Sequence, residues 1–253
     1  MIDENSVRRT EQTYANPDVV AQRERLLSML APQPGERVLD IGSGPGCLLE
    51  AIAEAVGPTG AAHGVDPSPA MNALAATRTD GMPWVRIDDG DAVALPYPDG
   101  VFDAAVSTQV HEYVADLAVA LGELRRVLRP GGRALILDTD ADSPVWHTTD
   151  RELDERVLAA WEEHLVHPRL PRTLRGLLRR AGFRVTEQRV HVMFNSQMTA
   201  DSYSAGTTAR FADGQQGLTE ADAETWLADL RARSDEGDYL QSIDRYLFLA
   251  TVA

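Results

Sequence analysis

The clearest chemical signal in this sequence is an acidic residue followed by three closely spaced glycines. Residues 38–46 read VLDIGSGPG, so an apolar run leads into Asp40 and then into glycines at positions 42, 44 and 46. Glycine lets a backbone turn tightly and approach a ligand closely. The helix that follows such a turn presents unpaired N–H groups. The pattern predicts a strand that turns into a helix at a ligand-binding loop.

The spacing of these glycines argues against a nicotinamide dinucleotide as the ligand. The fingerprint of that class is GxGxxG. Here the register is GxGxG, and Cys47 stands where the third glycine of the fingerprint would be. A nicotinamide-dependent oxidoreductase therefore remains only as an alternative interpretation.

Two further acidic residues follow the next two predicted strands. Asp66 comes 20 residues after Gly46, at a place where an acid can accept both ribose hydroxyls. Asp91 ends the third-strand region, where its carboxylate and the following N–H of Ala92 can read an adenine edge. Either acid alone would be interpreted as an ordinary loop residue. Three acids in order at three strand ends favour a nucleoside site.

Three residues beyond the fourth and fifth predicted strands are candidates for catalysis. His111 lies in TQVHEYV, four residues past Ser107, and is the first candidate for a general base. The alternative is a histidine that caps or packs the following helix. Asp140, in the acidic run DTDADS, is a candidate substrate contact, and His147 is a second candidate base. No metal site is expected at His164 and His167, which lack a third nearby ligand, and a magnesium site at the acids of DTDADS is only an alternative to a solvated strand end.

Short apolar runs alternate with amphipathic helices from residue 36 onward, which predicts stacked βαβ units. The expected fold class is α/β, with a doubly wound, mainly parallel seven-stranded sheet, an N-terminal helix and a lid inserted late in the chain. The predicted strands are residues 37–41, 62–65, 83–87, 102–107, 133–137, 183–194 and 246–252. The predicted helices are residues 17–30, 48–56, 69–77, 117–128, 151–165 and 171–181, and one more that begins at Thr219, where Thr219 and Asp222 resemble a capping box.

Three parts are expected within one compact domain. Residues 1–34 form an N-terminal helical cap, and residues 35–194 and 239–253 form the ligand-binding α/β domain. Residues 195–238 are polar and turn-rich, and an insertion there, between the last two strands, is predicted to cover the ligand end of the sheet as a lid or substrate-binding element.

Composition excludes several classes of function. Among 253 residues there are 24 arginines, no lysine and 39 acidic residues, which gives a net charge of −15. The absence of lysine removes Schiff-base chemistry and the lysine-dependent phosphate loop. So acidic a protein should repel nucleic acid and anionic membranes. One cysteine, Cys47, excludes disulfides and cysteine-rich zinc sites, and neither a secretory signal nor a transmembrane run is found, so a cytoplasmic protein is expected.

Two further motifs follow along the chain. The first, LPYPDGVFDAAVS, is a turn into the fourth strand, and the second, LRRVLRPGGRALILD, leads into the fifth strand. Over about residues 34–138 the chain closely resembles the class I S-adenosylmethionine-dependent methyltransferases, and most of all the small-molecule enzymes of the ubiquinone and menaquinone type. The resemblance implies seven strands with the last antiparallel, and S-adenosylmethionine as the cofactor. The residues that it implies for cofactor binding are Tyr14, Asp40, Gly42, Ser43, Gly44, Asp66, Pro67, Met71, Asp91, Ala92, Thr108 and Gln109.

The function expected from this resemblance is methyl transfer to a small organic acceptor in a bacterium, for example in secondary metabolism. Oxygen or carbon is preferred as the acceptor atom and nitrogen is an alternative. The reaction would be an in-line displacement driven by positioning, with His111 as general base if the acceptor must lose a proton. A monomer or homodimer is expected. A further alternative is a protein that binds the cofactor without methyl transfer, in a non-methylating reaction or as a regulatory partner.

Overall fold

The computed structural model describes residues 13–198 and 218–253. Strands and helices alternate along most of this length, as the predicted βαβ pattern requires. Their bounds, in chain order, are α2 (Pro17–Leu30), β1 (Arg37–Ile41), α3 (Cys47–Val56), β2 (Ala61–Asp66), α4 (Pro69–Arg78), β3 (Val85–Asp89), β4 (Phe102–Thr108), the 3₁₀ turn η1 (His111–Tyr113), α5 (Leu117–Val127), β5 (Leu128–Thr139), β6 (Val145–Trp146), α6 (Arg151–Glu162), α7 (Pro171–Arg180), β7 (Phe183–Asn195), α9 (Glu220–Asp235) and β8 (Gln241–Val252).

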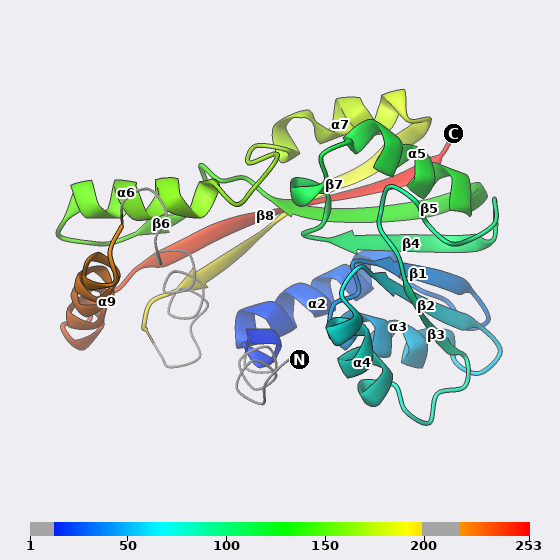
Figure 1. The fold of residues 1–253 in the computed structure, drawn as a ribbon, viewed down its shortest axis with the longest axis horizontal. Coiled ribbons are helices and arrows are strands. Elements are labelled where there is room, and N and C mark those ends of the chain that lie inside the picture. The colour runs from blue at the N-terminus through cyan, green and yellow to red at the C-terminus, as the bar shows by residue number, and fades with distance from the viewer. Residues whose placement is uncertain (1–12, 199–217) are drawn as a thin grey trace.

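The strands form one sheet in the order β3-β2-β1-β4-β5-β8-β6, with β7 also paired to β8. Strands β1 to β5 are mutually parallel, and β8 runs antiparallel to both β5 and β7. The doubly wound, mainly parallel sheet is confirmed, and a two-residue strand, β6, adds to the seven predicted strands. Because β1 lies between β2 and β4, the carboxyl ends of these three strands meet at one edge (Figure 1).

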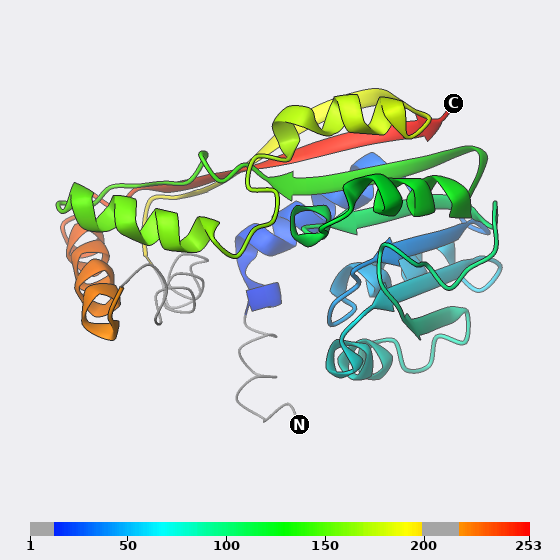
Figure 2. The same ribbon diagram turned by 45° about the horizontal axis from the view of Figure 1, so that its top comes forward.

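Helices cover both faces of the sheet, and alternate residues of one strand enter two different cores. On β1, Val38 packs with α2 and α3, while Leu39 packs with α5 and α7. Figure 2 shows these helix pairs on opposite sides of the sheet. In β1 residues 38–41 are all buried, and such burial of successive, mainly apolar residues is typical of strands covered on both faces. This packing fixes the strand tips at which the predicted site residues lie.

Several predicted boundaries differ from the structure. Strand β3 runs to Asp89, two residues beyond the predicted end, because Asp89 pairs in register with Asp66 of β2. Strand β5 begins at Leu128 rather than at residue 133, since Leu128 already pairs with Phe102 across a bulge. Strand β8 begins at Gln241 rather than at residue 246, because pairing with β7 extends out to Asn195.

The long strands β7 and β8 form an arm that extends beyond the rest of the sheet and carries α6 and α9 (Figure 1). Helix α9 begins after Thr219, and the predicted capping box between Thr219 and Asp222 is confirmed. Buried Trp226 and Leu230 of α9 pack with Leu153 of α6 in a separate small core. Of the predicted lid, residues 199–217 lie outside the described residues. Within residues 13–198 and 218–253, no helix is long and apolar enough to cross a membrane.

Candidate functional site

The glycine loop joins β1 to α3 and packs closely against its surroundings. The backbone is left-handed at all three glycines, with φ of 69° at Gly42, 52° at Gly44 and 82° at Gly46. A Cβ added at Gly42 would lie 2.2 Å from Cγ2 of Val110, so no larger residue fits there without movement. Gly46 is the N-cap of α3 and contributes no side-chain hydrogen bond. The first N–H groups of α3 are therefore open to a ligand.

A cavity of about 980 Å³ lies beside this loop, at the carboxyl ends of β1, β2 and β4. All twelve residues predicted for cofactor binding line it. They are Tyr14, Asp40, Gly42, Ser43, Gly44, Asp66, Pro67, Met71, Asp91, Ala92, Thr108 and Gln109. Open α/β sheets bind ligands at this edge, where the strand order reverses. The structure thus brings the whole predicted set together at one ligand-sized space.

Asp66 is fixed by two backbone donors at the tip of β2. Its Oδ2 accepts a hydrogen bond from the N–H of Gly44 at 3.0 Å, and its Oδ1 accepts one from the N–H of Ser68 at 2.9 Å. Asp66 is partly exposed at the cavity wall. Each carboxylate oxygen has further lone pairs for hydroxyl groups of a ligand. This arrangement fits a ribose, as the resemblance implies.

Asp40 is a buried carboxyl group that faces the same cavity. It is 2% exposed, and its Oδ2 has no hydrogen-bond partner among the described residues. Burial, followed by the nearby charge of Asp66, raises the pKa of Asp40 to about 8. Such a group is stabilised as a carboxylate by a positive ligand. The site therefore fits a cation next to the glycine loop.

Three more polar atoms are buried in the cavity wall without a partner among the described residues. They are Oγ of Ser43, Oγ1 of Thr108 and Oε1 of Gln22. Buried polar groups in proteins are nearly always hydrogen-bonded. Hydroxyl, amide and carboxylate groups that lack partners in the cavity wall fit polar groups of bound molecules, such as the ribose, ammonium and carboxylate groups of S-adenosylmethionine.

Asp91, Ala92 and Tyr14 also line the cavity. Asp91 follows β3, and its Oδ1 accepts a 3.0 Å hydrogen bond from the N–H of Val93, which shapes the turn that carries buried Ala92. Tyr14 lies over the glycine loop, since a Cβ at Gly44 would come within 3.0 Å of its hydroxyl oxygen. These positions fit contacts with the adenine and with the outer face of the cofactor.

His111 does not reach the cavity, contrary to its predicted role as a general base. Its side chain has no exposed surface and is not part of the cavity lining. Its Nδ1 lies 3.0 Å from Oγ of Ser107, and burial lowers its pKa to about 4. The alternative interpretation, a histidine packed at the start of the following turn, matches this geometry.

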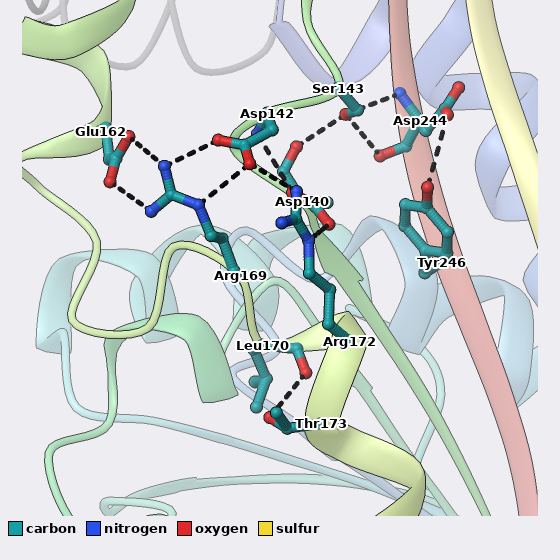
Figure 3. Close-up of polar contacts among 10 residues, drawn as sticks. All are labelled: Asp140, Asp142, Ser143, Glu162, Arg169, Leu170, Arg172, Thr173, Asp244 and Tyr246. Atoms are coloured by element: carbon teal, nitrogen blue, oxygen red, sulfur yellow. Dashed lines mark hydrogen bonds and ion pairs between the residues drawn. The ribbon is translucent and has the colours of Figure 1, made fainter.

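Asp140 does not line the cavity. Its carboxylate is held in a network of ion pairs (Figure 3). Arg172 of α7 donates to its Oδ2 at 2.6 Å and to its Oδ1 at 2.9 Å. Asp142 joins Arg172 to Arg169, which also pairs with Glu162. The network ties the segment after β5 to α6 and α7. Within the described residues, no three potential metal ligands are grouped to hold an ion.

His147 is exposed and directly follows β6, on the arm that carries α6 and α9. Its Nδ1 donates to the carbonyl oxygen of Asp238 at 2.8 Å. It does not line the cavity. None of the three predicted catalytic residues therefore lines the cavity that the predicted cofactor residues form.

Sequence reasoning missed one wall of the cavity, the face of α2. Val19, Gln22, Arg23 and Leu26 line the cavity at the i, i+3, i+4, i+7 positions of this helix. The sequence signal was present, because Gln22 and Arg23 interrupt a face that is otherwise apolar. Residues 110–119 also line the cavity in part, and they were predicted only as the connection between the fourth strand and the helix that starts at residue 117.

Comparison with known proteins finds a methyltransferase domain in part of the chain. Residues 39–136 match a family model described as a methyltransferase domain. The chain is 34% identical to an uncharacterised 37.1 kDa transposon protein of Streptomyces fradiae over 230 residues, which are 89% of this chain and 65% of that protein. It is 41% identical over 111 residues to a 2-phytyl-1,4-naphthoquinone methyltransferase of Synechococcus elongatus, covering 43% of this chain and 48% of that protein.

The fold is also similar to that of a putative methyltransferase from Bacillus halodurans. The two structures superimpose with a TM-score of 0.67 at 17% identity, over 91% of this chain and 98% of the other. The chain spans about half to two thirds of the length of the two relatives above. Residues 39–136 thus match a methyltransferase domain, and the sheet order and the cavity agree with the class I S-adenosylmethionine-dependent methyltransferases that the sequence resembles.

Proposed function

We propose that this protein transfers a methyl group from S-adenosylmethionine to a small organic acceptor. The observation that carries the proposal is the cavity of about 980 Å³ lined by all twelve residues predicted for the cofactor. Its wall contains a buried carboxyl group, Asp40, without a hydrogen-bond partner among the described residues. The likeness of the matched domain to a naphthoquinone methyltransferase supports a small-molecule acceptor.

The residues of this chain have separate roles in holding the cofactor. Asp66 would accept the ribose hydroxyls, and Asp91 with the N–H of Ala92 would bind the adenine. Asp40 would pair with the positively charged end of the methionine moiety, since an opposite charge favours its ionised form. Tyr14 would cover the bound molecule. When bound, S-adenosylmethionine supplies an electrophilic methyl group attached to a good leaving group.

Positioning of the acceptor is proposed as the main source of rate acceleration. Holding two reactants in line and in near contact replaces a bimolecular encounter by a local one. The described cavity lining contains no histidine, so the proposed mechanism does not use His111 as a base. Oxygen or carbon acceptors remain preferred over nitrogen. We further propose that the enzyme acts in the cytoplasm as a monomer or homodimer, and that it does not act on nucleic acid.

Incubation with methyl-labelled S-adenosylmethionine and a panel of phenols, quinones and amines tests this function. Label should appear in at least one acceptor and S-adenosylhomocysteine should accumulate in equal amount. Titration with S-adenosylhomocysteine and with NAD, each alone, separates the proposal from the oxidoreductase alternative. Binding of NAD without binding of S-adenosylhomocysteine would rule the proposal out, and cofactor binding without transfer to any acceptor would support the binding-protein alternative.

A further inference from the structure

The cavity is lined by further residues besides the twelve predicted to bind the cofactor. Its volume of about 980 Å³ is near the upper end of the roughly 300–1,000 Å³ that is usual for small-molecule sites. The additional lining comes from α2 on one side and from the segment after β4 on the other. A cofactor and a second small molecule therefore fit the same space.

The α2 face combines apolar and polar contacts in one stripe. Val19 and Leu26 are its apolar members, one at each end of the stripe. Between them Gln22 is only 5% exposed, and its Oε1 has no hydrogen-bond partner among the described residues. A buried amide oxygen of this kind can accept a hydrogen bond from a donor group of a bound molecule. The stripe is therefore built to contact something in the cavity.

Arg23 is the single basic side chain among the described residues that line the cavity. Its one hydrogen bond to a described residue is a long one, from Nη1 to the carbonyl oxygen of Tyr14 at 3.5 Å, and it forms no ion pair with them. By contrast, the arginines that pair with carboxylates among the described residues do so at N–O distances of 2.5–3.7 Å. A guanidinium binds carboxylates and similar planar anions with paired hydrogen bonds. Arg23 is thus available to an anionic ligand.

The cofactor's own carboxylate has another place to bind. Helix α3 starts at the glycine loop with no side-chain cap, and its first residues, Cys47 and Leu48, line the cavity. A helix N-terminus favours a carboxylate through its free N–H groups and its dipole. Arg23 lies on α2, between the apolar side chains of Val19 and Leu26, and this wall suits the acceptor better than an amino-acid tail.

We propose that the α2 face is the acceptor-binding wall, and that the acceptor is an acid with an apolar body whose anionic group is held by Arg23. This rests on the proposed methyltransferase function. Gln22 accepts a hydrogen bond from a hydroxyl or N–H group of the same molecule. Val19 and Leu26 contact its apolar part, and Val114 and Val119 face it from the segment after β4.

The test uses matched pairs of acids and amides that differ only in charge. Binding of 1-hydroxy-2-naphthoate and 1-hydroxy-2-naphthamide, and of 3-hydroxydecanoate and its amide, is measured by calorimetry with S-adenosylhomocysteine at saturation. In the wild-type protein at least one acid should bind about tenfold more tightly than its amide. Arg23→Gln should abolish this difference. Arg25→Gln is the matched control, because Arg25 is an exposed residue on α2 that does not line the cavity.

Cofactor affinity is measured separately in the same variants. S-adenosylhomocysteine and 5′-methylthioadenosine, which lacks the amino-acid carboxylate, should keep their wild-type affinities in Arg23→Gln. If Arg23→Gln weakens S-adenosylhomocysteine but not 5′-methylthioadenosine, Arg23 serves the cofactor and the acceptor assignment is overturned. Equal binding of every acid and its amide also overturns it. Failure of the wild-type protein to bind S-adenosylhomocysteine would instead overturn the proposed function.

Discussion

The N–H of Gly44 donates a 3.0 Å hydrogen bond to Oδ2 of Asp66, and this bond joins the glycine loop after β1 to the tip of β2. A second hydrogen bond joins the same two segments, because the N–H of Gly42 donates to the carbonyl oxygen of Val65 at 2.8 Å. These two hydrogen bonds hold the glycine loop and the end of β2 next to each other. Asp66 consequently has two functions, since it fixes the loop and faces the ligand.

Asp66→Asn should therefore weaken S-adenosylhomocysteine binding by roughly 10- to 100-fold, as expected for loss of hydrogen bonds to a charged acceptor. Calorimetric titration measures the effect. Asp80→Asn is the control, because Asp80 is an exposed acid that does not line the main cavity. Unchanged affinity in Asp66→Asn would remove Asp66 from the cofactor site.

Asp40 should make cofactor binding depend on pH. Its pKa in the free protein is raised to about 8, so below pH 8 it is largely protonated. A cationic ligand favours the carboxylate, and binding then releases a proton. The affinity of wild-type protein relative to Asp40→Asn should be near unity at pH 6 and should rise, by up to about tenfold per pH unit, until it levels off above pH 8.

The comparison with Asp40→Asn cancels the titration of the ligand's own amino group. A second control is 5′-methylthioadenosine, which has no ammonium and should show no such rise. A wild-type to Asp40→Asn affinity ratio that is constant from pH 6 to pH 9 would contradict the assigned role of Asp40.

Gly42→Ala should abolish cofactor binding, and the reason is lack of space as well as backbone strain. The new Cβ would lie 2.2 Å from Val110. Gly57→Ala is a matched control, because Gly57 has a similar φ of 65° with no atom within 4 Å of the added Cβ. It should cost about 1 kcal/mol of stability and leave affinity intact. Val110→Ala should partly rescue Gly42→Ala, and no rescue would argue against the steric explanation.

His111 should contribute to stability rather than to proton transfer. Its pKa is lowered to about 4 in the folded protein from an ordinary value of 6.5. The unfolded chain therefore binds the proton more readily, and the stability from the neutral ring is complete above pH 6.5 and is lost as pH falls towards 4. His111→Asn keeps a polar atom near Ser107 but does not titrate.

Denaturant titrations should accordingly show that the difference in unfolding free energy between wild type and His111→Asn shrinks from pH 6.5 to pH 4. His147→Asn, at an exposed position outside the cavity lining, is measured alongside as a control for the loss of a histidine. Methyl transfer should survive in His111→Asn. A folded His111→Asn variant with normal cofactor affinity and no turnover would restore His111 as a base.

The cofactor half of the site could be predicted from sequence because each of its residues is set by local chain geometry. Asp40 and Asp66 lie at the ends of apolar strands, and parallel strands in a doubly wound sheet bring such ends to one edge. The order of motifs along the chain then fixes their neighbours in space. The same logic predicted the strands of the sheet, apart from the two-residue β6.

The catalytic predictions used sequence position alone and could not detect burial. His111 follows β4 as predicted, yet the turn at its position directs it towards Ser107. Asp140 follows β5 as predicted, but Arg172, 32 residues later, binds its carboxylate. The α2 wall was missed because the packing of an N-terminal helix against a distant strand edge depends on contacts between remote residues.

A crystal structure of the protein with S-adenosylhomocysteine tests the central claim most directly. The predicted result is adenosine between Asp66 and Asp91, with the amino-acid end against Asp40 and the start of α3. The claim would be contradicted if the ligand bound elsewhere, or if this cavity stayed empty at saturating ligand.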